Sequence, residues 1–354
     1  MKVAIITQPL FRNYGGIFQN YALQQTLLRL GHEPITFDYV MTAKRRVRIR
    51  LGIKQRLFSL IGVKRDYSRR LGPHFRNGVF EEFVSKHIAL SRSMIGYDAS
   101  ALKEYNVDAI VVGSDQVWRP RYNIDLHDMY LRFARHSDII KIAYAASFGV
   151  NHWEYKLAKS NMARKLIRQF KAISVREASG IALCNKQLKM EATEVLDPTL
   201  LLSSSDYNRL CAHIPAPSKR KLFAYILDMT PEKQALVERI AANHKLEIEY
   251  AKEGTIAVEE WVAAFRDADY VVTDSFHGSI FSIIYRKEFL SIVNIDRGAS
   301  RFESLLSKFD LTDRIVTDME ITTIPKVDWE GVERRLQEWQ DISLSFLNNN
   351  LSNE

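Results

Sequence analysis

Short apolar runs rich in β-branched residues alternate with longer amphipathic segments along most of the chain. In the first half this pattern predicts strands near residues 3–7, 34–39, 108–113, 139–146 and 172–175 and helices near 18–30, 79–87 and 154–170. In the second half it predicts strands near 222–227, 246–251, 270–273 and 289–293 and helices near 232–243, 259–265 and 277–285. Such alternation is typical of open parallel α/β sheets. We therefore expect an α/β protein with two doubly wound, Rossmann-like domains.

The alternation is interrupted over residues 201–221. This stretch, LLSSSDYNRLCAHIPAPSKRK, contains serines, two prolines and a basic pair, a composition typical of linkers. It predicts an N-terminal domain of residues 1–205 and a C-terminal domain of residues 206–328. A long amphipathic helix begins at 329, and we expect this helix and the tail that ends at 354 to pack back on the N-terminal domain.

Charge is distributed unevenly along the chain. The 354 residues are 46% hydrophobic, which suffices for substantial cores, and they carry a net charge of +8. Residues 44–76 contain twelve Lys or Arg and a single acid, Asp66, inside an insertion at about 41–76. Such a block contacts an anionic membrane surface or a phosphorylated, lipid-linked substrate, or it is a solvated insertion with a small apolar stripe. Nucleic acid binding is not expected, because no recognised module accompanies the charge.

Several kinds of chemistry leave no signature in the sequence. Cys184 and Cys211 stand in unrelated contexts, which favours the reducing cytoplasm over a disulfide framework or a zinc site. The apolar run at the N-terminus is too short for a signal peptide or a spanning helix. Neither a dinucleotide fingerprint, a P-loop nor metal-ligand spacing is present. We therefore expect a cytoplasmic protein without a cofactor or metal, with the basic block as its candidate contact with the inner membrane face.

Polar clusters stand at the ends of four predicted strands. They are NYGG (13–16), VVGSDQVW (111–118), SVREASG (174–180) and TDSFHGSI (273–280). In open α/β sheets, ligands bind at the carboxyl ends of the strands, where loops enter helices whose exposed N–H groups favour anions. These clusters are therefore the predicted functional site.

Together with YAASFG (144–149), VLDPT (195–199) and RGASRFESLL (297–306), the four clusters resemble the polysaccharide pyruvyl transferase family. The resemblance rests on the ordered set and covers nearly the whole chain. It implies a fold similar to that of GT-B glycosyltransferases, with a cleft between the domains. It also implies an enzyme of bacterial surface polysaccharide biosynthesis, which transfers pyruvate from phosphoenolpyruvate onto two hydroxyls of a sugar, forming a cyclic ketal and releasing phosphate.

The implied donor carries a carboxylate and a phosphate, so its site needs fixed positive charge and backbone donors. Arg176 fits the first need, although it is also a candidate ion-pair partner of Glu177. The helix start near 277–280 fits the second, because Gly278 permits close approach of a ligand and Ser275 and Ser279 add hydroxyls.

One position departs from the family pattern. The best-known pyruvyl transferases have an arginine two residues before the histidine, where this chain has Ser275. Arg297 and Arg301, which follow the next strand, are the candidates to replace it.

The reaction that the resemblance implies needs a general acid, because the enol ether becomes electrophilic once its methylene carbon is protonated. His277 is the candidate, with helix capping as its structural alternative. Asp115 is the candidate base or sugar ligand, with turn formation as its alternative. Asp274 is expected to cap the following helix or to orient the histidine.

The remaining strand-end residues are candidates for contact with the acceptor. Gly15 and Gly16 contact the acceptor or merely shape the first turn, and Tyr14 and Trp118 are core residues or sugar platforms. The full set is Asn13, Tyr14, Gly15, Gly16, Ser114, Gln116 and Trp118.

Two other functions are compatible with the pattern. One is a GT-B glycosyltransferase that uses a nucleotide sugar in the same cleft. The other is a non-catalytic protein that binds glycans or lipid headgroups.

Overall fold

The computed structural model describes residues 1–11, 13–40, 76, 78–123, 125–293, 299–321 and 325–352. Of the predicted basic insertion at 41–76, only Arg76 belongs to the described residues. Arg297 also lies outside them.

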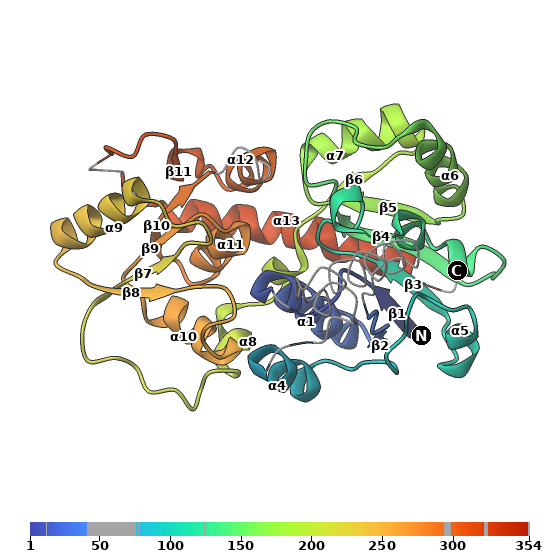
Figure 1. The fold of residues 1–354 in the computed structure, drawn as a ribbon, viewed down its shortest axis with the longest axis horizontal. Helices are drawn as coiled ribbons and strands as arrows, with labels where there is room; N and C mark the ends of the chain where they lie inside the picture. Colours follow the sequence, from blue (N-terminus) through green and yellow to red (C-terminus); the bar gives the residue numbers. More distant parts are fainter. Residues whose placement is uncertain are drawn as a thin grey trace, which may run out of the picture.

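Two parallel sheets organise the chain (Figure 1). The first has the order β2-β1-β3-β4-β5-β6, and its strands pair in parallel. These strands are β1 (Lys2–Ile6), β2 (Glu33–Thr36), β3 (Ala109–Val112), β4 (Ile140–Ala146), β5 (Ala172–Val175) and β6 (Thr193–Glu194).

The second sheet has the order β11-β10-β9-β7-β8, and its strands also pair in parallel. Its strands are β7 (Lys221–Tyr225), β8 (Glu247–Ala251), β9 (Tyr270–Thr273), β10 (Glu288–Ile292) and β11 (Ile315–Val316). In each sheet the first strand in sequence is an interior strand. β1 lies between β2 and β3, and β7 lies between β8 and β9. The predicted fold class, two doubly wound α/β domains, is confirmed.

Helices cover the sheets (Figure 1). In the first half they are α1 (Tyr14–Arg29), α4 (Gly78–His87), α5 (Ser100–Glu104), α6 (Leu157–Ile167), α7 (Ala178–Leu183) and α8 (Ser204–Asn208). In the second half they are α9 (Pro231–His244), α10 (Val258–Asp267), α11 (Phe276–Ile284), α12 (Ala299–Lys308) and α13 (Trp329–Asn350). None of the helices in the described part of the chain combines the length and apolar character that a membrane crossing requires.

Helix α1 begins four residues earlier than the pattern of apolar residues predicts. The side chain of Asn13 accepts a hydrogen bond of 2.9 Å from the Gly16 N–H and so caps the first turn. Gly15 and Gly16 hide this start in the sequence because glycine disfavours helix interiors. The early start carries the N-terminus of α1 toward the C-terminal domain.

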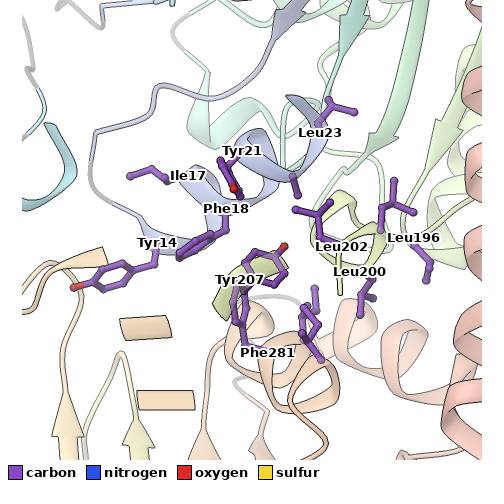
Figure 2. Close-up of a cluster of buried hydrophobic side chains, with 14 of the residues drawn as sticks. Tyr14, Ile17, Phe18, Tyr21, Leu23, Leu196, Leu200, Leu202, Tyr207 and Phe281 are labelled. Atoms are coloured by element: carbon purple, nitrogen blue, oxygen red, sulfur yellow. The ribbon is translucent and has the colours of Figure 1, made fainter. Parts of the chain in front are cut away.

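Aromatic side chains on α1 join the two domains in one hydrophobic core. The rings of Tyr14 and Phe18 stack on Trp261 of α10 at centroid distances of 5.2 and 5.4 Å. Phe18 also contacts Phe281 of α11 and Tyr207 of α8 (Figure 2). All five side chains are fully buried. Each aromatic pair contributes about 0.5–1.5 kcal/mol beyond its buried area. The domains therefore share a continuous apolar core.

Helix α13 makes a second connection between the domains, red in Figure 1. It follows the C-terminal domain in sequence but contacts the N-terminal one. Ser343 accepts a hydrogen bond of 2.9 Å from the Leu196 N–H, and Gln340 donates one of 2.6 Å to the Leu200 carbonyl. Phe346 packs near Tyr144, with 6.2 Å between the ring centroids.

The shared core predicts that both domains unfold together and that Trp261→Ala lowers the free energy of unfolding by about 3–5 kcal/mol, as large buried aromatics do. Leu157→Ala, at a side chain that is 75% exposed, is the control and changes it by less than about 0.5 kcal/mol. Urea unfolding followed by circular dichroism and fluorescence checks this. Two separate transitions in the unaltered protein contradict the shared core.

Candidate active site

A cavity of about 420 Å³ lies between the two domains. Its walls come from the carboxyl ends of β1, β3, β7, β8 and β9 and from α12. The strand order reverses between β1 and β3 in one sheet and between β7 and β9 in the other, so the cavity joins both switch points. Ligands of doubly wound sheets bind at this position. The lining residues include Gln8, Asn13, Gly16, Asp115, Gln116, Arg121, Tyr122, Glu253, Ser275, Phe276, His277 and Arg301.

His277 lies in the first turn of α11 and faces the first turn of α1. Ser275 caps α11 by accepting a hydrogen bond from the Gly278 N–H, which fixes the turn that carries the imidazole. The ring occupies space that a side chain at residue 15 would fill: a Cβ on Gly15 would lie 1.9 Å from the His277 Nδ1. Gly15 is therefore required for the two helix N-termini to meet at the cavity.

On the other side of the imidazole stands Asp197, which belongs to the N-terminal domain. Its Oδ2 atom lies 3.7 Å from the His277 Nε2, a distance of electrostatic contact rather than of a hydrogen bond. Burial by itself raises the pKa of Asp197, but His277 and Arg176 lower it well below the ordinary value of an aspartate. Asp197 is thus a fixed anion beside the histidine.

Asp115 follows β3 in a left-handed backbone conformation, with φ of 70°. A non-glycine residue adopts this conformation when its surroundings impose it, and such residues concentrate at functional sites. Arg176 donates a hydrogen bond of 2.9 Å to Oδ1 of Asp115. Burial raises the pKa of Asp115, but Arg176 and His277 together lower it below its ordinary value. The carboxylate in the cavity wall is therefore ionised at neutral pH.

Arg176 is a predicted donor-binding residue, but it does not line the cavity. Its side chain is 1% exposed, and it donates to Asp197 at 2.6 Å and to Asp115 at 2.9 Å, with Glu177 at 3.8 Å. The ring of Phe276 lies 4.7 Å from the guanidinium. Asp115 and Asp197 together carry more negative charge than the arginine carries positive charge, so Arg176 holds these two carboxylates in place and is not exposed to the cavity.

Arg301, on α12, is the arginine that the structure brings to the cavity wall. Its guanidinium lies 5.4 Å from the Phe276 ring. Burial and the nearby Arg176 lower the pKa of Arg301 to about 10, so it remains a cation at neutral pH.

Two further carboxylates hold the loops around the cavity. Asp274 accepts hydrogen bonds from the N–H groups of Leu227 and Asp228 and from Lys233 at 2.6 Å. It therefore neither caps α11 nor orients His277, the two roles expected for it. Glu253 of the C-terminal domain accepts a hydrogen bond of 2.8 Å from the Tyr14 N–H, so it closes the N-terminus of α1 from across the cleft.

Several predicted site residues make contacts in the protein core and do not line the cavity. Trp118 is fully buried and stacks on Tyr130, and its indole donates to the Met129 carbonyl. Tyr14 donates its hydroxyl to the Ile256 carbonyl in the shared core. Three more do not line the cavity: Ser114 bonds to the Ala145 carbonyl, Ser279 to Ser291, and Gly278 lies against Thr273. Short polar residues near a strand end look alike in sequence, whether they face the ligand or the core.

The sequence did not single out Gln8, Arg121, Tyr122, Glu253 and Phe276, all of which line the cavity. Gln8 could have been found, since it directly follows the first strand. Tyr122 and Glu253 belong to longer loops, whose direction depends on tertiary packing.

A family model described as polysaccharide pyruvyl transferase matches residues 13–297. The chain belongs to the polysaccharide pyruvyl transferase family. The match includes Asp115 and His277, which line the cavity, and Asp197, which lies behind the imidazole. No curated protein sequence matches the chain.

Solved structures with similar overall folds are distant in sequence. The UDP-GlcNAc 2-epimerase from Neisseria meningitidis, bound to UDP-GlcNAc, is 11% identical over 98% of this chain and 94% of its own, with a TM-score of 0.49. The UDP-GlcNAc 2-epimerase from Methanocaldococcus jannaschii is 9% identical over 96% of this chain and 93% of its own, with a TM-score of 0.45. The spinosyn forosaminyltransferase SpnP is 10% identical over 99% and 95%, with a TM-score of 0.42. The functional argument for this family member rests on its own site.

The contact between Gly15 and His277 predicts that Gly15→Ala displaces the imidazole, because the added methyl overlaps the ring. Gly16→Ala is the matched control, since the nearest atom to a Cβ there lies 3.7 Å away. Histidine side-chain NMR signals of both variants check this. We expect the His277 signal to shift in Gly15→Ala only; an unmoved signal in that variant contradicts the described packing.

Proposed function

We propose that this family member transfers pyruvate from phosphoenolpyruvate onto two hydroxyls of a sugar as a cyclic ketal, in the synthesis of a bacterial surface polysaccharide. The observation that carries the proposal is the pairing of His277 with the cation of Arg301 in one interdomain cavity, opposite the ionised Asp115. An acid, an anion-binding group and a hydroxyl-binding carboxylate are the three parts that the reaction needs.

In this proposal the donor lies against the C-terminal domain. Arg301 pairs with its phosphate or carboxylate and takes the place of the arginine that the family has at Ser275. The N-terminus of α11 points into the cavity, and a helix N-terminus favours an anion by roughly 0.3–1 kcal/mol. The N-terminus of α1 is already closed by Glu253. The buried Arg176 holds Asp115 in place and does not contact the donor in this proposal.

In the first step an acceptor hydroxyl attacks C2 of phosphoenolpyruvate while His277 delivers a proton to the C3 methylene, which becomes a methyl group. The hydroxyl proton leaves toward Asp115 or water. Asp197 stabilises the imidazolium before transfer because it lies 3.7 Å away. With its lowered pKa, Asp115 acts mainly as a hydrogen-bond acceptor that orients the sugar.

In the second step the neighbouring hydroxyl attacks C2 and the bond from C2 to the phosphate oxygen breaks. The phosphate leaves with the second hydroxyl proton, and the product is the ketal with a free carboxylate. One proton therefore ends on the methyl group and one on phosphate, and the proton of the first hydroxyl returns through water to His277, which restores the acid. Arg301 stabilises the charge on the departing phosphate.

The proposed donor predicts that phosphoenolpyruvate raises the melting temperature of the protein, whereas UDP- and GDP-sugars do not. Arg301→Met is expected to weaken this binding by about tenfold or more, since a charge-assisted contact contributes about 1.5–3 kcal/mol. Arg209→Met, at a side chain that is 78% exposed, is the control. A shift with nucleotide sugars alone would favour a glycosyltransferase.

The proposed acid predicts that His277→Gln lowers phosphate release from phosphoenolpyruvate by about 10²-fold or more while donor binding persists. His213→Gln, at an exposed position, is the control. Release is measured with glycans from a bacterial lysate as acceptors. If the unaltered protein releases no phosphate with any of these acceptors, it is a glycan-binding protein without turnover.

We also propose that residues 44–76 hold the enzyme near an anionic membrane face, where a lipid-linked acceptor is available. The support is compositional: twelve basic residues against one acid. Each basic residue contributes about 1 kcal/mol at such a surface. Cosedimentation with vesicles containing phosphatidylglycerol is expected, and it should fall with added salt and with Ser at positions 44, 45, 46, 48 and 50. Equal binding to neutral vesicles contradicts an electrostatic contact.

A further inference from the structure

Helix α12, which carries Arg301, has an apolar face and a polar face. Three side chains of the apolar face are buried in the hydrophobic core: Phe302, Leu305 and Leu306. Ser304 and Lys308 follow Arg301 by three and seven residues, a spacing that places side chains on one face of a helix. The face that presents Arg301 to the interdomain cavity therefore also carries Ser304 and Lys308.

This polar face contacts the N-terminal domain, and α12 lies beside α7 in Figure 1. Ser304 donates a hydrogen bond of 2.9 Å to Oε1 of Glu194 on β6 and accepts one of 3.1 Å from the Ala178 N–H at the start of α7. Lys308 forms an ion pair with the same Glu194 carboxylate, and the side chains of the pair are 5% and 16% exposed. The helix that carries Arg301 is thus fixed by groups of the other domain.

The same contact reaches the residue that organises the acids of the site. Glu194 pairs with Val175 in the register of β5 and β6, and Arg176 is the next residue along the chain. The Lys308 ammonium lies 3.4 Å from the Arg176 carbonyl, while the Arg176 side chain holds Asp115 and Asp197. Arg301 and the acids of the site are therefore supported by one connected set of groups.

We propose that Ser304, Lys308 and Glu194 are positioning residues that hold Arg301 at the interdomain cavity and so set the affinity for the anionic donor. The described lining of the cavity includes Arg301 but none of these three, so they act through the helix. A small displacement of a group that binds a reactant costs large factors in rate or affinity. The inference rests on the proposed role of Arg301 in binding the donor.

The first test needs no donor. Lys308→Met removes the ammonium and keeps most of the length of the side chain, so we expect the side-chain Nε–H signal of Arg301 to shift in NMR spectra. Arg301→Met assigns this signal by its loss. Lys186→Met, at an exposed position, is the matched control and should leave the signal in place. An unmoved Arg301 signal in Lys308→Met overturns the inference.

The second test is the affinity for phosphoenolpyruvate, measured by calorimetry. Lys308→Met and Ser304→Ala are each expected to weaken binding by about threefold or more, since residues of one contact network couple to that extent. Ser307→Ala, the same substitution at an exposed position of α12, is the control and should change the affinity by less than about twofold.

A double variant separates positioning from a general loss of stability. In an Arg301→Met background, Lys308→Met should weaken phosphoenolpyruvate binding by less than about twofold, because the arginine that it positions is already gone. If the full loss persists in that background, Lys308 acts independently of Arg301 and the positioning role is wrong.

Ser304→Ala leaves the ion pair intact, so both measurements can be made on it if Lys308→Met does not fold. If the unaltered protein does not bind phosphoenolpyruvate, the proposed donor is wrong, and the Arg301 signal still decides whether α12 is positioned by these contacts. Failure of the proposed function and failure of this inference are therefore distinguishable.

Discussion

The stacking of α1 on Trp261 is the contact on which the site depends. Tyr14 and Phe18 belong to the first helix of one domain and Trp261 to the other, yet all three are fully buried in one core. This contact fixes the N-terminus of α1 against that of α11, which brings Gly15 under the His277 ring and the Tyr14 N–H to Glu253. Without this stacking contact, the distance between the switch points of the two sheets would not be fixed. A catalytic group and the surface it acts on must be held closely, because small misplacements cost large factors in rate.

Beneath the cavity, the ion cluster of Arg176 illustrates why a buried charge is a poor ligand for a substrate. The arginine compensates Asp115 and Asp197, and removal of such a partner from a buried pair costs about 3–5 kcal/mol. Drawing the guanidinium toward a substrate would leave these carboxylates without compensation. Arg176 therefore acts through the two acids that it orients, whereas Arg301 and the N-terminus of α11 present positive potential at the cavity wall. The strand-end motifs thus supply both a buried ion cluster and residues of the cavity wall.

The sequence predicted the fold class well because alternation of strands and helices is a local property. Four of the candidate residues, His277, Asp115, Gln116 and Arg301, line one cavity, because the carboxyl ends of the strands of both sheets meet there. The sequence misplaced the start of α1 because the Asn13 cap was hidden by two glycines, and it left α12 unassigned. It could not tell that Arg176 is enclosed by acids distant in sequence, or that Trp118 turns toward Tyr130. These contacts depend on whether a side chain after a strand faces the cavity or the core. A shift of one residue along the chain reverses that direction.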